Sequence, residues 1–282
     1  MIALIQRKML SFKMDFSNFE EYLTSTIEQM DISSDNLKSA MIYSVKRGGK
    51  RLRPKFSLLT ANAFDIDPKL IYPYAAALEM IHEFSLVHDD LPCMDNDNFR
   101  RGKETTHVVY GEMNALLAGD GLLNLAAEIS FDDLMVDNDI NKVRAYKFLF
   151  NKAGALGMIG GQAFESEAKA TKEDYFKTIN GKTVALFECA IYGSGLYLGL
   201  GKKELNLLAN LSINIGQGFQ AIDDRSDEDG IYKISKEECQ KIINDCKNNI
   251  DSIYKSLSEL DASVNGYKEI TDVLFSKEFI NN

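Results

Sequence analysis

The sequence predicts an all-α fold, with a single large helical bundle over residues 15–282. The chain has four prolines, and the 190 residues that follow Pro92 contain none. Because proline interrupts helices, a stretch of this length without proline favours long helices. Apolar residues also recur at helical spacing, and no alternating run of comparable length predicts a strand. Helices are therefore the expected elements throughout.

Two segments carry the clearest helical spacing. The first contains Ala77, Met80, Ile81, Phe84, Val87 and His88, and the second contains Leu116, Leu117, Leu122, Leu123, Leu125 and Ala126. Breaks between helices are expected at residues 65–68, 137–141, 160–161, 199–201 and 229–230. Glycines inside helical segments, such as Gly216 and Gly218, lower helix propensity and indicate close helix packing or an approach of ligand to backbone. Packing is the simpler interpretation for each one alone.

Composition limits the class of protein. The 282 residues include 32 basic and 42 acidic ones, which gives a net charge of −10 and a pI near 4.9. An acidic chain of this kind has no uniform basic face, so we expect no nucleic-acid partner. Because 45% of the residues are hydrophobic, the chain can bury a large core. Without a linker or repeat, one domain is expected over 15–282.

The ends of the chain and its cysteines indicate location. No apolar run approaches the roughly 18 to 20 residues that span a bilayer, so no membrane span is expected. Residues 1–14 form an N-terminal extension that does not resemble a signal peptide, because Arg7 and Lys8 interrupt it, and Met14 is a second candidate start. The four cysteines form no C-x-x-C pair and only three histidines accompany them. Neither a zinc site nor a disulfide framework is expected, which favours the reducing cytoplasm.

A first acidic cluster directly follows the first of the two segments with clear helical spacing. Its members lie within nine residues of one another: Asp89, Asp90, Asp95 and Asp97. Carboxylates this close repel one another unless cations neutralise them, and such oxygen ligands suit Mg²⁺ together with substrate phosphates. The following Arg100 and Arg101 support this interpretation, because arginine binds phosphate oxygens through two N–H groups. An acidic helix end or a surface loop is the alternative.

A second acidic cluster forms a stripe at positions i, i+3, i+4 and i+7: Gln220, Asp223, Asp224 and Asp227. Residues at this spacing share one helix face. Like charges there need compensation by cations, unless the stripe is simply an acidic solvent face. The two acidic clusters are about 130 residues apart and each follows an apolar helical segment. They can therefore face each other across a bundle and hold several divalent ions.

A basic run contrasts with the acidic chain. Residues 46–55 include six basic residues, and Gly48 and Gly49 within the run allow a turn whose backbone amides meet an anion. Together with His82, the run predicts an anion pocket that needs no metal, and a solvated charge run is the alternative. Lys182 and Thr183 begin an apolar helix and are either ligands or only a helix-start signal.

In this combination and order the motifs resemble the trans-isoprenyl diphosphate synthases, the family of farnesyl and geranylgeranyl diphosphate synthases. The resemblance rests on residues 89–95, 100–102, 48–54 and 223–227, and extends to 111–112, 117–120, 160–162 and 182–183. It covers about residues 15–275. It implies an isoprenoid synthase-like helical bundle around a central cavity with two facing aspartate clusters. It also implies a homodimer with its interface along long apolar helices.

The resemblance assigns roles to matching positions. Those implied for the pocket of isopentenyl diphosphate are Lys50, Arg53, His82 and Arg101. Contacts to the allylic diphosphate are implied for Arg100 and Lys182. The implied ligands of three Mg²⁺ ions are Asp89, Asp95 and Asp223, with Asp227 in support. Next to the reacting carbon, the implied residues are Thr183 and Gln220, with Lys182 beside them.

The implied reaction is the Mg²⁺-dependent condensation of isopentenyl diphosphate with dimethylallyl or geranyl diphosphate. Metal and arginines stabilise the charge on the leaving diphosphate, so that the allylic C–O bond ionises. The π bond of isopentenyl diphosphate then attacks the allylic cation, and a proton is lost to the departing diphosphate. A mostly apolar tunnel keeps water away from the cation.

Product length is expected to depend on residues one helical turn before Asp89, because a turn rises about 5.4 Å, close to one isoprene unit. Those residues are Phe84 and Ser85, which would form the floor of the tunnel. An aromatic residue at 84, together with four residues between Asp90 and Asp95 in the first motif, is similar to the pattern of the bacterial farnesyl type. A C15 product is therefore predicted. Phe84 as a simple core residue is the alternative.

One departure from the family pattern follows the second acidic cluster. After residues 227–230 the chain continues almost directly with Ile231, so the loop at this point is shorter than the family pattern. Lys233 or Lys236 would take the place of a lysine that the family has after its second aspartate motif. The alternatives to farnesyl diphosphate synthesis are a C20 or C10 synthase and a non-catalytic partner subunit of a heteromeric synthase. Intact aspartates in both clusters argue against the partner subunit, and the shortened loop argues for it.

Overall fold

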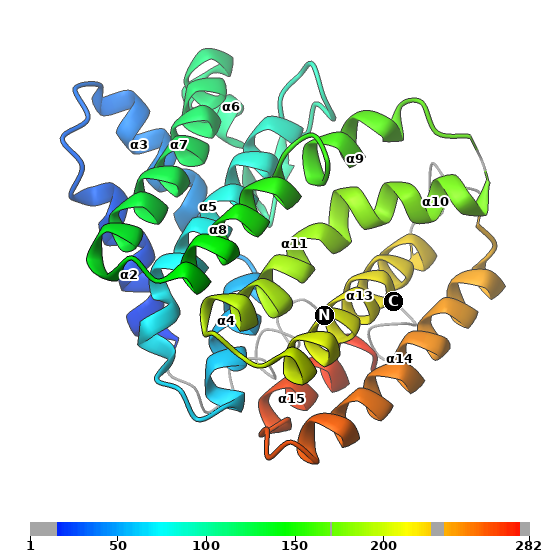
Figure 1. Ribbon diagram of the computed structural model, residues 1–282. Coiled ribbons are helices and arrows are strands. Elements are labelled where there is room, and N and C mark those ends of the chain that lie inside the picture. The colour runs from blue at the N-terminus through cyan, green and yellow to red at the C-terminus, as the bar shows by residue number, and fades with distance from the viewer. Residues whose placement is uncertain (1–15, 170, 227–233, 277–282) are drawn as a thin grey trace. The chain divides into compact units, whose positions relative to one another are not determined.

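The computed structural model describes residues 16–169, 171–226 and 234–276, and its architecture is all-α, as predicted (Figure 1). The chain divides into two compact units. Of the described residues, the N-terminal unit contains 16–55 and 72–138, and the C-terminal unit contains 56–71, 139–169, 171–226 and 234–276. The prediction of one domain over 15–282, after an extension over 1–14, stays a prediction.

The N-terminal unit is built around two long helices that pack along each other, α5 (Tyr72–Asp89) and α7 (Glu112–Asp137). Its other elements are α2 (Ser17–Glu28), α3 (Asp35–Lys46), the first turn of α4 (Leu52–Ala63), β1 (Phe99–Arg100), β2 (Lys103–Glu104) and α6 (Thr106–Tyr110). Apolar residues of α5 are buried around nearly its whole circumference, from Tyr74 to Val87. A helix that is apolar on all sides belongs in a core, which makes α5 a rigid support for the residues at its end.

A two-stranded hairpin follows α5, and the periodicity analysis did not predict it. Phe99 pairs with Glu104 and Arg100 pairs with Lys103 in antiparallel register. Arg101 and Gly102 connect the strands with φ of +57° and +75°. Positive φ at both central residues is typical of a type I′ turn, for which glycine at the second position is well suited. The hairpin fixes the backbone of Arg100 and Arg101.

The C-terminal unit contains the long pair α13 (Lys202–Ser226) and α14 (Lys236–Ser258), which lie side by side (Figure 1). Its other elements are the rest of α4, η1 (Pro68–Ile71), α8 (Ile140–Ala153), α9 (Met158–Glu165), α10 (Lys172–Ile179), η2 (Asn180–Val184), α11 (Ala185–Glu188), η3 (Cys189–Gly193), α12 (Ser194–Tyr197) and α15 (Asn265–Leu274). The segments η2 and η3 are single π-helical turns. Such turns are rare in proteins overall, but they occur often at functional sites.

Most predicted breaks in the C-terminal unit are confirmed, but one is wrong. Helix α13 begins directly after residues 199–201, as expected. Residues 160–161 lie inside α9, and the break comes earlier, after α8 ends at Ala153. Gly161 serves packing instead, because a Cβ there would lie 2.6 Å from the carbonyl carbon of Gly181. Gly216 and Gly218 also face close neighbours, which confirms packing as their role. The break expected at 229–230 lies outside the described residues.

Helix α7 exposes part of its apolar pattern. Leu122 and Leu125 are buried, whereas Leu116 and Leu117 are exposed. Not all of the second periodic segment therefore belongs to the core. Within the described ranges no helix, α7 included, has the length and apolar character needed to cross a membrane.

Candidate active site

The predicted site residues form two groups, one in each unit. The N-terminal unit holds Lys50, Arg53, His82, Phe84, Ser85, Asp89, Asp95, Arg100 and Arg101, and the C-terminal unit holds Lys182, Thr183, Gln220 and Asp223. Asp227, which was predicted to support metal binding, lies outside the described residues. Lys50 lies half-buried in the loop between α3 and α4.

The loop that carries Lys50 packs against Arg101. Gly48 and Gly49 have φ of +90° and +138°, a conformation that favours glycine. Arg101 donates a hydrogen bond to the Gly48 carbonyl, and a Cβ on Gly49 would lie 2.7 Å from the guanidinium carbon of Arg101. The predicted turn is thus present, and it brings the basic run and Arg101 together.

Arg53 and His82 are also in direct contact. An N–H of Arg53 lies 3.0 Å from Nε2 of His82. Because arginine only donates, Nε2 accepts, and the neutral ring carries its proton on Nδ1. Burial lowers the pKa of His82 well below its usual value of 6.5, and the charges of Arg53, Arg101, Arg51 and Arg100 lower it further. His82 is therefore neutral and fixes the direction of the Arg53 side chain.

This depressed pKa predicts a pH dependence of stability. Below pH 6.5 the unfolded chain binds a proton at His82 that the folded protein does not bind, so the free energy of unfolding falls as the pH falls from 6.5. For one proton the slope reaches about 1.4 kcal/mol per pH unit. In His82→Gln, whose amide oxygen still accepts from Arg53, urea denaturation between pH 6.5 and 5.5 should show a shallower slope. Equal slopes in both proteins would contradict the assignment.

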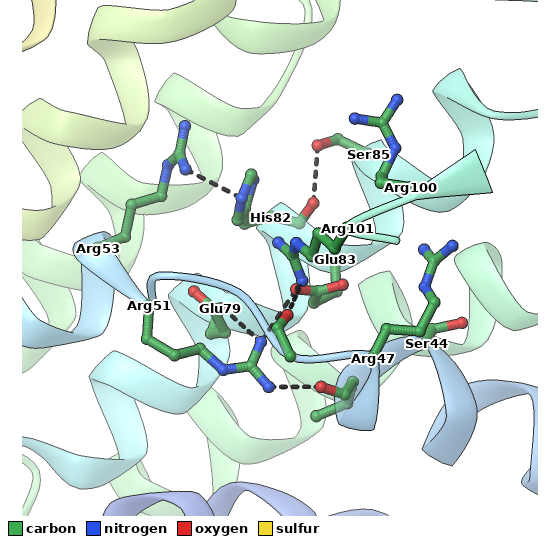
Figure 2. A network of polar contacts seen from close by, with 12 residues as sticks. Ser44, Arg47, Arg51, Arg53, Glu79, His82, Glu83, Ser85, Arg100 and Arg101 are labelled. Carbon is green, nitrogen blue, oxygen red and sulfur yellow. Dashed lines mark hydrogen bonds and ion pairs between the residues drawn. The ribbon is translucent and has the colours of Figure 1, made fainter. Parts of the chain in front are cut away.

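Arg51, the neighbour of Lys50, is the centre of a buried ion network (Figure 2). Its guanidinium contacts Glu79 at 2.8 Å and Glu83 at 3.0 Å. It also contacts Glu20 at 2.9 Å and donates to the Val45 carbonyl. Burial by itself would lower the pKa of Arg51, but the carboxylates of Glu79, Glu83 and Glu20 reverse this and raise it. Arg51 therefore neutralises acids of the core and anchors the basic loop to α5.

Acidic residues also hold the two hairpin arginines. Glu83, which is fully buried, contacts Arg101 at 2.8 Å (Figure 2). Arg100 pairs with Asp90 and, at 3.3 Å, with Asp97. The predicted phosphate-binding guanidinium groups are thus held in place by carboxylates, which reduces the entropy that binding would cost.

The first acidic cluster separates into residues of two kinds. Asp90 is fully buried and also pairs with Arg47 at 3.2 Å. Asp89 lies half-buried at the end of α5 and Asp95 is exposed, and the N–H of Asp95 donates to the carbonyl oxygen of Asp89 at 2.9 Å. This hydrogen bond closes the turn after α5 and keeps the backbones of the two predicted metal ligands, Asp89 and Asp95, close to each other.

These carboxylates suit a Mg²⁺ ion that completes its shell with phosphate. In the described part of the chain no three His, Cys, Asp or Glu side chains gather into a group that could hold a metal ion. Mg²⁺ is usually bound through one or two carboxylates together with substrate phosphates and water. Asp89 at the end of α5 and Asp95 in the turn that follows it fit that coordination.

The two predicted floor residues lie on α5. Phe84 is 5% exposed and contacts His88 edge to face at 5.7 Å between ring centroids. Nε2 of His88 lies 3.0 Å from the Leu116 carbonyl oxygen. The Ser85 hydroxyl donates to the His82 carbonyl at 2.8 Å. Phe84 therefore packs against His88, which in turn contacts α7, and its role as a floor stays a prediction.

In the C-terminal unit a π-helical turn and α13 bring the predicted reacting-carbon residues together. The Thr183 hydroxyl donates to Oε1 of Gln220 at 2.7 Å, and Nε2 of Gln220 donates to Asp224 at 2.8 Å. Lys182 pairs with Glu165 at 2.6 Å. Asp223 is exposed on α13, next to Asp224. Residues that are 37 positions apart in the sequence thus form one polar cluster.

Several residues that support these groups had no individual role in the prediction from sequence: Arg47, Arg51, Glu79, Glu83, Glu165 and Tyr175. Asp90 was predicted only as a member of the first acidic cluster. A signal was present for Glu79 and Glu83, because acids that interrupt an apolar helix must be buried with cationic partners. The basic run supplied such a partner in Arg51. No comparable signal in the sequence marks Tyr175 or Glu165.

Comparison with known proteins identifies the family. The model of the polyprenyl synthetase family matches residues 34–261. The chain is 37% identical over 261 residues to the farnesyl diphosphate synthase of Bacillus subtilis, which covers 91% of this chain and 86% of that protein. It is 40% identical over 187 residues to the geranylgeranyl diphosphate synthase of Cyanophora paradoxa, covering 64% and 62% of the two chains.

A solved structure agrees with this comparison. The geranyltransferase from Legionella pneumophila superposes with a TM-score of 0.86 at 26% sequence identity and covers 99% of both chains. The chain therefore belongs to the polyprenyl synthetase family.

Proposed function

We propose that the protein is a farnesyl diphosphate synthase, which condenses isopentenyl diphosphate with dimethylallyl or geranyl diphosphate in isoprene biosynthesis. The observation that supports this most is 37% identity to a farnesyl diphosphate synthase over 91% of the chain. Arg100 and Arg101 near a neutral His82, with Asp89 at the end of the same helix, agree with it. A site of this kind is suited to diphosphate and a divalent cation.

The roles proposed for the residues are those that the family resemblance implies. For isopentenyl diphosphate the proposed ligands are Lys50, Arg53, His82 and Arg101, and for the allylic diphosphate they are Arg100 and Lys182. Mg²⁺, proposed at three ions held by Asp89, Asp95, Asp223 and Asp227, supplies charge that stabilises the leaving diphosphate. Lys182 is paired with Glu165 in the free protein, so binding the diphosphate requires it to exchange partners. Thr183 and Gln220 present polar oxygen atoms to the reacting carbon.

The reaction needs no nucleophilic side chain. The allylic C–O bond breaks with its electron pair on the diphosphate, and the π bond of isopentenyl diphosphate attacks the cation. A proton then leaves the new allylic product for the diphosphate. Fixed positive charge from Arg100 and Lys182 lowers the energy of the separating charges.

The purified chain by itself tests the enzyme proposal against a non-catalytic partner subunit. With isopentenyl diphosphate, Mg²⁺ and each allylic starter in turn, we expect release of inorganic diphosphate, and a chelator should abolish it. No release with any starter would contradict an enzyme. Release only after a second synthase subunit is added would support the partner subunit.

Phe84→Ala is expected to lengthen the product from C15 to C20 or longer. Removing the ring opens space one turn below Asp89, close to the length of one isoprene unit. The measurement is chromatography of products made from labelled isopentenyl diphosphate. A C20 product from the unaltered chain would favour the geranylgeranyl alternative, and a C10 product the geranyl one.

Phe19→Ala is the matched control for this variant. Phe19 is also a buried phenylalanine of the N-terminal unit, on α2. Its loss creates a comparable cavity, and both variants should lose about 3 to 5 kcal/mol of stability. Only Phe84→Ala should change the product. An unchanged product in Phe84→Ala would support a simple core role for Phe84.

We also propose a homodimer. Large apolar side chains of α7 are exposed at helical spacing, among them Met113, Leu116, Leu117, Phe131 and Met135. Exposed apolar side chains that gather on one surface often mark interaction sites, and the family resemblance implies an interface along long apolar helices such as α7.

The cytoplasm is the proposed location. Cys93, Cys189, Cys239 and Cys246 are free thiols, and reducing compartments keep cysteines in that form.

A further inference from the structure

A chain of three hydrogen bonds runs through the C-terminal unit from a buried tyrosine to Thr183. The Tyr175 hydroxyl donates to Oδ2 of Asp224 at 2.8 Å, and Gln220 donates to Oδ1 of the same carboxylate at 2.8 Å. Thr183 in turn donates to Gln220 at 2.7 Å. The chain connects α10, α13 and the π-helical turn η2.

The chemistry of the groups gives this chain one direction. An ionised carboxylate only accepts hydrogen bonds, so Asp224 must face the NH₂ group of Gln220. The amide oxygen of Gln220 then points to Thr183, whose single hydroxyl hydrogen it takes. Thr183 is left with lone pairs, and no hydrogen, for any other neighbour. If the amide were reversed, its NH₂ would occupy a lone pair of Thr183 and free the hydroxyl hydrogen.

Tyr175 is placed to hold the Asp224 carboxylate in the orientation in which it accepts from Gln220. Its side chain is fully buried, and it lies in the first helix that precedes η2. Burial and the neighbouring Asp224 both raise the pKa of the Tyr175 hydroxyl, so it remains a donor. Because two donors bind the two oxygens of Asp224, one from α10 and one from α13, the carboxylate plane is fixed.

We propose that Tyr175 is a positioning residue, which acts through Asp224 to hold the Gln220 amide in one orientation, so that Thr183 offers lone pairs to the electron-poor allylic carbon. This inference rests on the proposed function. Lone pairs stabilise a carbon that is becoming positive, whereas a hydroxyl hydrogen pointed at it would raise its energy. Asp224 thereby differs from Asp223: the carboxylate of Asp224 orients Gln220, and Asp223 is a proposed metal ligand.

Tyr175→Phe tests the proposal, with Tyr254→Phe as a matched control. Tyr254 is also buried in the C-terminal unit, and its hydroxyl lies 3.0 Å from that of Thr271. Both variants lose one buried hydrogen bond and keep the ring. Steady-state kinetics should show a kcat about tenfold lower for Tyr175→Phe, the size expected when one hydrogen bond to a charged group is lost. Tyr254→Phe should change kcat less than twofold.

The effect should fall on kcat and not on binding. KM for both diphosphate substrates should stay within about twofold in Tyr175→Phe, because these hydrogen bonds end at the reacting carbon and not at the phosphates. Unchanged kcat, or an equal loss in Tyr254→Phe, would overturn the proposal. A wild-type chain that is inactive with every allylic starter would instead count against the proposed function.

Asp224→Asn supplies a second test that does not require Tyr175→Phe to fold. Asparagine can turn either its oxygen or its NH₂ toward Gln220, so the amide orientation is no longer enforced and kcat should fall. The Mg²⁺ concentration for half-maximal activity should stay within about twofold, and a large rise would show a metal ligand instead. In the Asp224→Asn background, Tyr175→Phe should have no further effect. Additive losses would show that Tyr175 acts by another route.

Discussion

Asp89→Ala is expected to reduce kcat about 1,000-fold and to destabilise the protein less than Asp90→Ala does. Asp89 lies half-buried at the end of α5 and is a proposed Mg²⁺ ligand. A metal ion at the leaving group contributes several kcal/mol to transition-state stabilisation, and about 4 kcal/mol corresponds to three orders of magnitude. The measurement is kcat for diphosphate release at saturating substrates, together with urea denaturation.

Asp90→Ala, one residue further on, is the contrast that makes this test sharp. Asp90 is fully buried and pairs with Arg47 and Arg100. Its removal leaves the buried Arg47 without its carboxylate, so we expect a loss of about 3 to 5 kcal/mol in the free energy of unfolding. If Asp89→Ala proved the less stable of the two, or kept full activity, the separation of metal-binding and structural aspartates would be wrong.

Gly161→Ala is expected to lower both stability and kcat. The new Cβ would lie 2.6 Å from the carbonyl carbon of Gly181 and closer still to the backbone nitrogen of Lys182. Backbone atoms cannot swing away, so α9 and η2 must move apart at a cost near the upper end of about 1 to 3 kcal/mol. That outweighs the gain in helix propensity of about 1 kcal/mol. We expect a net loss of about 2 kcal/mol in urea denaturation, and a lower kcat because Lys182 and Thr183 shift.

Gly121→Ala is the control for this variant. Gly121 also lies inside a helix, but the nearest atom to a new Cβ is the sulfur of Met41 at 3.0 Å, on a flexible side chain that can move. The variant should be as stable as the original chain or slightly more stable. Equal stability of Gly161→Ala and Gly121→Ala would show that the contact between α9 and η2 tolerates separation.

Much of the fold could be predicted because helix signals are local. Helical spacing and the scarcity of proline predicted the all-α class, and the first of the two segments with clear helical spacing is confirmed as the core helix α5. The hairpin at residues 99–104 was missed, since strands of two residues carry no periodicity. The break expected at Gly160 was wrong because a glycine pair can either end a helix or allow two helices to pack closely. Here the glycines lie inside α9, and the contact between Gly161 and Gly181, which shows the packing role, is not visible in the local sequence.

The candidate site was predictable where charge alone carries the signal. Arg100, Arg101 and Asp89 were found because phosphate and metal chemistry needs those residue types at short spacing. The division between Asp89 and Asp90 was not predictable, because neighbouring aspartates look alike until one of them meets Arg47 in the interior. Tyr175 was missed for the same reason, since its contact with Asp224 joins positions 49 residues apart. Ion pairs between distant segments depend on packing that local sequence does not encode.

The central claim is tested most directly by the product that the purified chain makes from labelled isopentenyl diphosphate and dimethylallyl diphosphate. We predict a label-containing C15 diphosphate as the main product when Mg²⁺ is present and none after chelation. No prenyl product in Mg²⁺, or label mainly in C10 or C20 chains, would contradict the assignment as a farnesyl diphosphate synthase.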